Sequence, residues 1–246
     1  MAHSDRTILR VSGPDTRHFL QGLVTNDVAR LDSGLVYAAL LTPQGKYLAD
    51  FFLVPDGEDV LIDADADQAP ALMQRLAMYK LRSKVDITQT DLAVTRGTGT
   101  PPQGAYADPR HPSLGWRGYA GQPGQDADWN ALRVAACIPQ SGIELTPDTF
   151  ILEAGFERLN GVDFKKGCYV GQEVTARMKH KTELRKGLAL VTVDGAAPLG
   201  SDITAEGKPV GTIYTQSGGR GIAYLRFDRA SGPMQADGAS LRLASD

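Results

Sequence analysis

Several short, mainly apolar stretches bounded by turn residues lie in the first part of this chain, which is typical of strands. The predicted strands lie at 7–11, 36–41, 46–54 and 85–89. Thr42-Pro43-Gln44-Gly45 joins two of them as a hairpin turn, because proline suits its second position and glycine its fourth. Apolar spacings of three and four residues predict helices over 15–23 and from Pro70 to about Arg82.

An acidic run, Asp63-Ala-Asp-Ala-Asp67, places carboxylates at the first, third and fifth positions of a calcium loop. Gln68 and Gln74 stand where that loop needs its glycine and its bidentate glutamate, which excludes the loop. Aspartates favour the positive end of a helix dipole. We therefore expect this run to begin the helix that contains Pro70.

The middle of the chain, from Gly97 to Asp128, is rich in glycine and proline and is predicted to be a loop. Asp128 can cap a helix over 129–136. After residue 183, short apolar runs separated by turns favour a small antiparallel sheet or barrel. The pattern predicts an α+β fold divided at 1–96, 97–182 and 183–246, with the barrel last.

Composition restricts the function classes. Of 246 residues, 42% are hydrophobic and 22% charged, and the net charge of −3 argues against a general nucleic-acid binder, which needs many cations. No apolar run approaches the roughly 20 residues of a membrane span, so no membrane partner is expected. The two cysteines have no metal-site spacing, and without a secretory leader a cytoplasmic location follows as the expectation.

The densest chemistry lies in Lys166-Gly-Cys-Tyr-Val-Gly-Gln-Glu173. Neighbouring lysines and a helix beginning near Gly171 would both favour the thiolate form of Cys168, so a reactive cysteine is one interpretation. The other is a small buried hydrophobe whose lysines point to water. Gly167 and Gly171 flank the thiol, where they allow a positive φ and close approach of another backbone.

This octapeptide resembles, without a gap, the signature of the YgfZ-type folate-binding proteins, which belong to the wider family of the glycine-cleavage aminomethyltransferase, or T-protein. The signature positions are Lys166, Gly167, Cys168, Tyr169, Gly171, Gln172 and Glu173. Further similarity lies at 19–28, 79–85 and 207–213. The resemblance implies a body of related α+β subdomains around a central, folate-binding cavity, followed by a C-terminal antiparallel β-barrel.

The same resemblance implies that tetrahydrofolate is the cofactor and that Glu153 holds its pterin ring. A carboxylate suits this role because it can accept two parallel N–H donors. Asn26 and Asp27 could line the cavity, although an Asn-Asp pair after a helix is equally a turn or cap. Arg82, Arg177 and Lys179 are alternative partners for the glutamate tail of the folate.

Catalysis is where the sequence departs from the T-proteins. These enzymes carry a paired aspartate after the hairpin, whereas here only Asp50 remains, so Asp50 is the candidate base. Loss of a general base typically slows a reaction by roughly 10² to 10⁴. A tetrahydrofolate-dependent aminomethyl or one-carbon transferase is therefore the alternative function, and the expectation leans away from an enzyme.

The favoured expectation from the resemblance is a folate-binding accessory protein of iron–sulfur cluster assembly or repair, supporting enzymes such as tRNA-modifying methylthiotransferases. Cys168 would take part in thiol exchange or ligate iron transiently. Two cysteines cannot hold an ordinary cluster, so iron–sulfur proteins or assembly factors are the expected partners. A third interpretation is a folate or nucleotide binding module in which Cys168 is structural.

Overall fold

The computed structural model describes residues 5–180 and 183–244. The chain forms two compact units, each built from two segments. The first contains residues 1–127 and 156–176, and the second contains 128–155 and 177–246. The division at 96/97 and 182/183 remains a prediction from the sequence.

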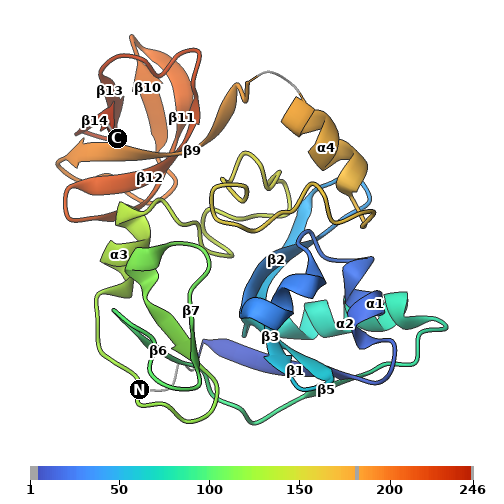
Figure 1. Cartoon of the computed structure of the whole chain (residues 1–246). Coiled ribbons are helices and arrows are strands. Elements are labelled where there is room, and N and C mark those ends of the chain that lie inside the picture. The colour runs from blue at the N-terminus through green and yellow to red at the C-terminus, as the bar shows by residue number, and fades with distance from the viewer. Residues whose placement is uncertain (1–4, 181–182, 245–246) are drawn as a thin grey trace. The chain divides into compact units, whose positions relative to one another are not determined.

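A five-stranded antiparallel sheet forms the centre of the first unit (Figure 1). Its strands are β1 (Arg6–Ser12), β2 (Val36–Leu41), β3 (Tyr47–Asp56), β4 (Asp59–Asp65) and β5 (Asp86–Gln89), in the order β2-β3-β4-β1-β5. Three helices belong with it, namely α1 (Thr16–Gln21), the 3₁₀-helix η1 (Val28–Ser33) and α2 (Ala69–Lys80). Leu20 and Leu76 are fully buried in the apolar core that these elements share with the sheet.

The acidic run was predicted wrongly in part. Asp63 and Asp65 do not begin a helix, because they end strand β4, and α2 begins only at Ala69. Asp63 is fully buried and Asp65 is half-buried. The strand was missed because acidic residues lie at its ends. Acidic residues are as compatible with the first turn of a helix as with the end of a strand.

The glycine-rich middle of the chain is also more ordered than the sequence suggests. It contains a second sheet of three short strands, β6 (Thr95–Gly97), β8 (Trp116–Gly118) and β7 (Ala105–Ala107), in that spatial order, and a 3₁₀-helix η2 (Pro112–Leu114). Gly97 lies directly under the Trp116 ring, and a side chain at this position would overlap the indole. Each strand has three residues, too few to show an alternating pattern.

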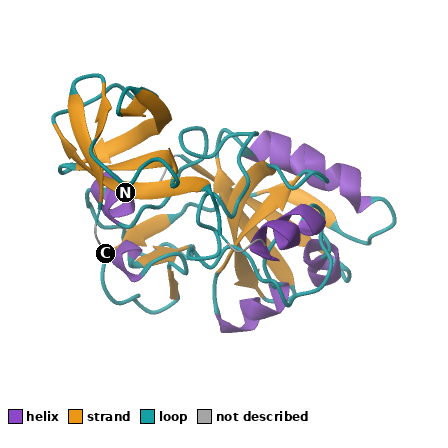
Figure 2. Cartoon of the chain, turned by 90° about the horizontal axis from the view of Figure 1, so that it is seen from above, coloured by secondary structure: helices purple, strands orange, loops and turns teal. Residues whose placement is uncertain are grey.

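The second unit contains helix α3 (Trp129–Ala135) and a closed β-barrel, whose strands are drawn in orange like all others in Figure 2. Asp128 caps α3 as predicted, since its side chain accepts the Ala131 N–H at 2.8 Å. The barrel order is β10-β11-β12-β9-β14-β13. The strands are β9 (Lys186–Asp194), β10 (Asp202–Ala205), β11 (Lys208–Ser217), β12 (Arg220–Arg226), β13 (Met234–Ala236) and β14 (Ala239–Leu243).

The mixed α/β body and the C-terminal antiparallel barrel confirm the predicted fold class. Helix α4 (Gln172–His180) begins in the first unit and ends in the second. The helix that was expected to begin near Gly171 is confirmed, since α4 begins at Gln172.

Candidate functional site

The signature loop is fastened to the end of helix α1 by two residues that are 145 positions apart in the chain. The Lys166 ammonium donates to the carbonyl oxygens of Gln21, at 2.5 Å, and Val24, at 2.7 Å. The Gln21 side-chain amide donates in return to the Lys166 carbonyl at 3.0 Å. Because the last carbonyls of a helix have no partner within the helix, the lysine satisfies groups that would otherwise be left without one.

The turn Thr25-Asn26-Asp27 holds the segment that leads into the signature. Thr25 donates its hydroxyl to the Gly161 carbonyl at 2.6 Å, and the Asn26 amide donates to the carbonyls of Asn160 and Tyr37 at 2.7 and 2.8 Å. Asp27 caps η1 through the Ala29 N–H. The turn-and-cap interpretation of this pair is confirmed, and a further role in folate binding stays a prediction.

Cys168 is exposed, so the interpretation of this residue as a small buried hydrophobe is wrong. The two lysines before it differ: Lys165 is exposed, whereas Lys166 is buried, with its ammonium 4.9 Å from the centre of the Tyr169 ring. Burial lowers the pKa of Lys166 to about 8, although Asp27, Asp163 and Cys168 act in the opposite direction. The loop thus exposes the Cys168 thiol to solvent, while the loop itself is held in place by Lys166.

Both glycines of the signature have the positive φ expected of them, +94° for Gly167 and +83° for Gly171. At Gly171 the close approach comes from the chain itself, because a Cβ there would lie 2.6 Å from the Thr42 carbonyl oxygen in the β2–β3 turn. Gly167 faces open space. The Gln172 side chain donates to the Gly167 carbonyl at 2.9 Å, while Glu173 is exposed in the first turn of α4.

Asp50, the candidate base, is buried in β3 and lies between two tyrosines. Tyr37 donates its hydroxyl to one carboxylate oxygen at 2.9 Å, and Tyr47 donates to the other at 2.6 Å. Burial raises the pKa of Tyr37 well above its usual range, and the Asp50 charge raises it further. Tyr37 therefore stays protonated, and the two hydroxyls together fix the orientation of the Asp50 carboxylate.

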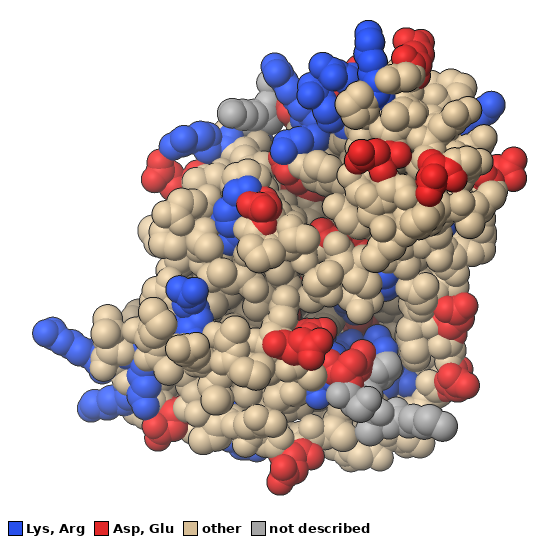
Figure 3. All heavy atoms as spheres, turned by 180° about the vertical axis from the view of Figure 1, so that it is seen from behind, with Lys and Arg blue, Asp and Glu red and all other residues tan. Residues whose placement is uncertain are grey.

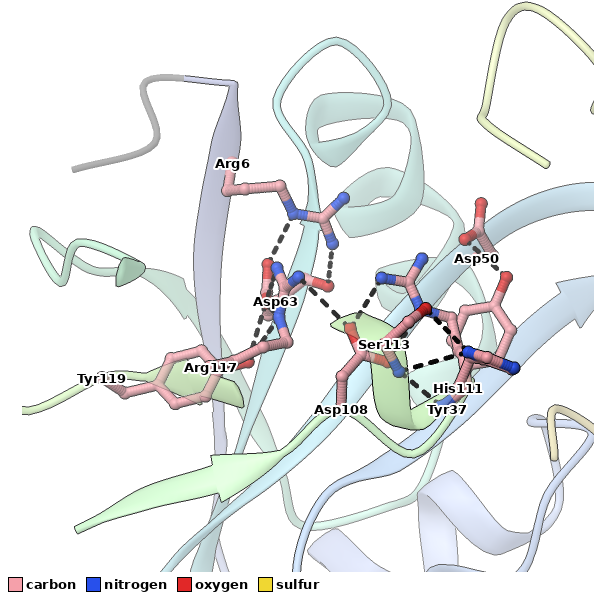
Figure 4. A network of polar contacts seen from close by, with 10 residues as sticks. Arg6, Tyr37, Asp50, Asp63, Asp108, His111, Ser113, Arg117 and Tyr119 are labelled. Atoms are coloured by element: carbon pink, nitrogen blue, oxygen red, sulfur yellow. Dashed lines mark hydrogen bonds and ion pairs between the residues drawn. The ribbon is translucent and has the colours of Figure 1, made fainter. Parts of the chain in front are cut away.

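A buried charge network, which sequence patterns did not reveal, lies beside Asp50 in the first unit. Figure 4 shows Arg6, Arg117 and Tyr119 pointing toward Asp63. Arg117 donates twice to one Asp63 oxygen, at 2.7 and 2.9 Å, and Arg6 donates to the other at 2.6 Å. The Arg117 guanidinium also lies 4.3 Å from the centre of the Phe52 ring.

The Asp63 carboxylate holds this network together. Burial by itself raises the pKa of Asp63, but the Arg117 and Arg6 guanidiniums outweigh that effect and lower it to about 2. The only sequence signal was the acidic run that includes Asp63, and its partner Arg117 lies 54 positions away. Removing one partner of such a network would leave a buried charge uncompensated, so we assign the network to the fold of the first unit.

Glu153 belongs to the second unit, where it lines a cavity of about 900 Å³ together with Lys186 and Arg226. One carboxylate oxygen accepts the Tyr224 hydroxyl at 2.6 Å, and the other lies 3.8 Å from the Lys186 ammonium. Glu153 is fixed by its backbone, because its carbonyl accepts the Leu188 N–H at 2.7 Å. Burial and the Glu153 carboxylate together raise the pKa of Tyr224, which keeps this phenol a donor.

This arrangement fits a ligand with two parallel N–H donors, such as a pterin. Each carboxylate oxygen has two acceptor positions, so the oxygen bonded to Tyr224 keeps one position and the oxygen facing Lys186 has room for a donor. The candidates for the folate tail belong to different units. Arg82 is exposed after α2 in the first unit, and Arg177 and Lys179 are exposed on the part of α4 that belongs to the second.

Two general features can be stated for the described residues. Residues 5–180 and 183–244 contain no group of three or more His, Cys, Asp or Glu side chains that could hold a metal ion. Within the same ranges, no helix is long and apolar enough to cross a membrane.

Comparison with known proteins adds relatives that match along most of the chain. The "Iron-sulfur cluster assembly factor IBA57, mitochondrial" of Homo sapiens is 32% identical and covers 98% of this chain, which spans 82% of that relative. The Mus musculus protein of the same name is also 32% identical, with 93% and 78% covered. The IBA57 homolog of Mycosarcoma maydis is 36% identical over 74% of this chain, which spans about half (54%) of that relative's length.

The barrel and the whole fold each have a separate match. Residues 185–245 match the family described as "CAF17, C-terminal beta-barrel domain". The crystal structure of the glycine cleavage system aminomethyltransferase T from Bartonella henselae has a TM-score of 0.78 and covers 99% of this chain and 84% of its own, at 15% identity. This likeness shows that the two chains share the T-protein fold.

The expectation of a cytoplasmic location is wrong in the light of these relatives, which are named as mitochondrial proteins. The expectation rested on cysteine usage and composition. Cysteine usage distinguishes oxidising from reducing compartments and gives no further information on the cellular location. The location therefore could not be obtained from the features that the prediction used.

Proposed function

This chain belongs to the family of the IBA57 iron–sulfur cluster assembly factors, and we propose that it supports iron–sulfur cluster assembly or repair as an accessory protein that binds tetrahydrofolate. The observation that carries the proposal is the exposed Cys168 thiol, which lies on a loop fastened to α1 through Lys166 and Gln21. A reactive group on a loop that is held in place can contact a partner in one defined geometry.

Cys168 would act by supplying one thiolate ligand to iron or by thiol exchange, since both use the deprotonated sulfur. An iron–sulfur cluster commonly needs four thiolates, and this chain has only Cys137 and Cys168. The remaining ligands would come from an iron–sulfur protein, an assembly factor or a second copy of the chain. Cys168 would thus ligate the cluster only transiently, and another protein would bind it stably.

Glu153 would hold the pterin ring of tetrahydrofolate in the cavity of the second unit. The buried carboxylate is positioned by the Tyr224 hydroxyl and by its own backbone, and the Lys186 ammonium faces its other oxygen from 3.8 Å. When bound, tetrahydrofolate supplies a carrier for one-carbon units. On this chain, Glu153 and Tyr224 would bind and orient its pterin end.

The finer parts of the proposal come from the signature octapeptide. Its resemblance to the YgfZ-type proteins supports the proposal that this chain assists enzymes such as tRNA-modifying methylthiotransferases, which carry iron–sulfur clusters. A complementation experiment tests the role of Cys168: a Cys168→Ser chain should fail to restore iron–sulfur enzyme activity in cells that lack the native protein, whereas Cys137→Ser should restore it. Equal restoration by both variants would remove Cys168 from the proposal.

Calorimetry with tetrahydrofolate, under reducing and anaerobic conditions, tests the folate part. Glu153→Ala should weaken binding by roughly 1.5 to 3 kcal/mol, the value for a lost charge-assisted hydrogen bond. Glu183→Ala, which removes another carboxylate at the same cavity, is the matched control and should have a smaller effect. Absence of binding by the unmodified chain would exclude a folate function altogether.

A second candidate function is a tetrahydrofolate-dependent aminomethyltransferase, and the buried Asp50 carboxylate is the observation that favours it. Against it, both oxygens of Asp50 already accept a tyrosine hydroxyl, so the carboxylate is oriented toward Tyr37 and Tyr47. Production of methylene-tetrahydrofolate from a lipoyl-bound aminomethyl group or a methylated amine would establish this function in place of the accessory role.

A further inference from the structure

The turn after helix α2 holds a leucine in a conformation that leucine rarely adopts. Ser83 donates its N–H to the Lys80 carbonyl at 2.7 Å, which closes a turn with Leu81 at its first central position. Leu81 has φ 35° and ψ −97°, close to the position that a type II′ turn reserves for glycine. Such backbone strain persists where it serves the structure or a function.

Packing does not explain why a leucine stands there. Leu81 is 89% exposed, the highest value among the large apolar side chains that the structure describes as exposed. Met78, one helical turn earlier, is 61% exposed. Leu81 and Met78 thus leave two apolar side chains about one helical turn apart in solvent, at a turn whose backbone strain is not offset by packing of Leu81 within the protein.

The surroundings of Leu81 are basic. Between Gln68 and Val85 the sequence contains four cationic residues and no carboxylate, although the whole chain carries a net charge of −3. The four are Arg75, Lys80, Arg82 and Lys84. Lys80 pairs with Asp86 beyond the turn at 2.9 Å, and the other three are exposed. Two carboxylates contact this segment, since Asp86 pairs with Lys80 and Asp15 accepts the Lys84 N–H at 2.7 Å. Four cations against these two carboxylates leave this edge with an excess of positive charge.

The turn is also convex. In Figure 1 the chain leaves the end of α2 in a turn that projects beyond the helix before it returns as β5, and Figure 3, seen from behind, shows lysine and arginine side chains projecting at the corresponding edge. We propose that this turn is a contact site for an anionic lipid surface. Leu81 and Met78 would enter the apolar layer, while Arg75, Arg82 and Lys84 would face the lipid phosphates.

A lipid surface fits these observations better than a protein partner does. A stable protein interface buries about 800 Å² on each side and would need a shaped pocket for Leu81, whereas a convex turn offers few side chains. A lipid layer accepts a projecting apolar side chain without a pocket, and its phosphates complement the cations. No described helix of residues 5–180 and 183–244 can span a bilayer, and a turn that lies on the surface needs none.

Vesicle co-sedimentation of the full chain tests the proposal, with phosphatidylcholine vesicles that contain or lack phosphatidylserine. Binding should require phosphatidylserine and should weaken as salt is added. Leu81→Gly should lower the affinity roughly tenfold, because the apolar side chain is lost. It should also raise the melting temperature, since glycine suits the turn. Leu199→Gly is the control: Leu199 is 62% exposed in the barrel unit, has no Lys or Arg within five residues of it, and its loss should leave binding unchanged.

The double variant Arg75→Gln with Lys84→Gln should lower the affinity at least tenfold, since each cation near an anionic surface contributes about a fivefold factor. Three results would overturn the proposal: no binding of the unmodified chain, binding that Leu81→Gly leaves intact, or Leu81-dependent self-association in sedimentation without vesicle binding. The last would assign the turn to a contact between copies. The rise in melting temperature keeps the Leu81→Gly result interpretable, because lost binding would then not reflect unfolding.

Discussion

Gln21 and Lys166 exchange hydrogen bonds in both directions: each side chain donates to the main-chain carbonyl of the other, at 3.0 and 2.5 Å. These residues lie in two of the motifs that carry the resemblance, 145 positions apart. The pairing explains physically why the two motifs occur together. The first motif supplies the end of α1, and the second supplies the cation that satisfies its carbonyls.

Gln21→Ala should lower the free energy of unfolding by about 1 to 3 kcal/mol, because it removes three hydrogen bonds and leaves the Lys166 carbonyl without its donor. Denaturant unfolding gives the value. His18→Ala is the control on the same helix, and its exposed side chain should contribute less than about 0.5 kcal/mol. Equal values for the two variants would show that the exchange has no energetic role.

The lowered pKa of Lys166 makes a pH prediction with a definite sign. The folded chain loses this proton near pH 8 and the unfolded chain near 10.5, so between these values the unfolded state binds more protons and stability rises with pH. The contribution of Lys166 is complete above about pH 10.5 and lost as the pH falls through 8. Relative to Lys166→Met, the free energy of unfolding of the unmodified chain should rise by on the order of 2 kcal/mol across this window.

The measurement is a series of unfolding curves, recorded in a Cys168→Ser background so that the nearby thiol takes no part. Lys165→Met is the matched control, because Lys165 is adjacent but exposed, and it should show no such pH-dependent difference. If the free energies of unfolding of the unmodified chain and of Lys166→Met differed by a constant amount from about pH 7 to about pH 11, that result would contradict the assignment of a buried ammonium.

Asp63→Asn should destabilise the chain by about 3 to 5 kcal/mol, because it leaves the guanidiniums of Arg6 and Arg117 buried without their counter-charge. Asp59→Asn removes a more exposed partner of Arg10 and should cost at most about 1 kcal/mol. The lowered pKa of Asp63 adds a second readout. Its stabilising contribution is complete above about pH 3.8 and lost as the pH falls to about 2, so acid unfolding curves of the two variants should differ in this range.

The sequence predicts those parts of the molecule whose pattern is local. Short apolar runs bounded by turn residues identified β1, β2, β3 and β5, and Asp128 was recognised as a cap because its partner lies three residues away. Asp63 was misread because an aspartate at a strand end resembles a helix start, and the arginines that hold it lie far away in the chain. Only tertiary packing decides such a role.

The same reason separates Lys165 from Lys166. The two are neighbours of one type, yet one is exposed and the other is buried under the end of α1, which no local pattern encodes. The exposure of Cys168 follows from that difference, since the buried lysine fixes the loop and the thiol two positions later faces solvent. The octapeptide could be recognised from the sequence, but the direction of its side chains could not.

The two signature glycines should respond differently to alanine, although both have a positive φ. At Gly167 the added methyl group meets open space, so only the backbone strain of about 1 to 2 kcal/mol applies. At Gly171 the methyl group would also press on the Thr42 carbonyl at 2.6 Å, which adds about 1 to 3 kcal/mol of overpacking and shifts the β2–β3 turn. Gly171→Ala should therefore be the more destabilising variant in denaturant unfolding.

Function separates the two further. Since Gly167 is open and next to the thiol, Gly167→Ala should impair complementation of iron–sulfur enzyme activity by more than its stability loss explains, because a methyl group there hinders the approach of a partner to Cys168. Gly45→Ala serves as the control for Gly171→Ala, because it strains the same contact from the opposite side, where its Cβ would lie 2.8 Å from Val174. If Gly167→Ala complemented fully while Gly171→Ala and Gly45→Ala failed equally, the signature would act by holding the hairpin, and the thiol would not be its working part.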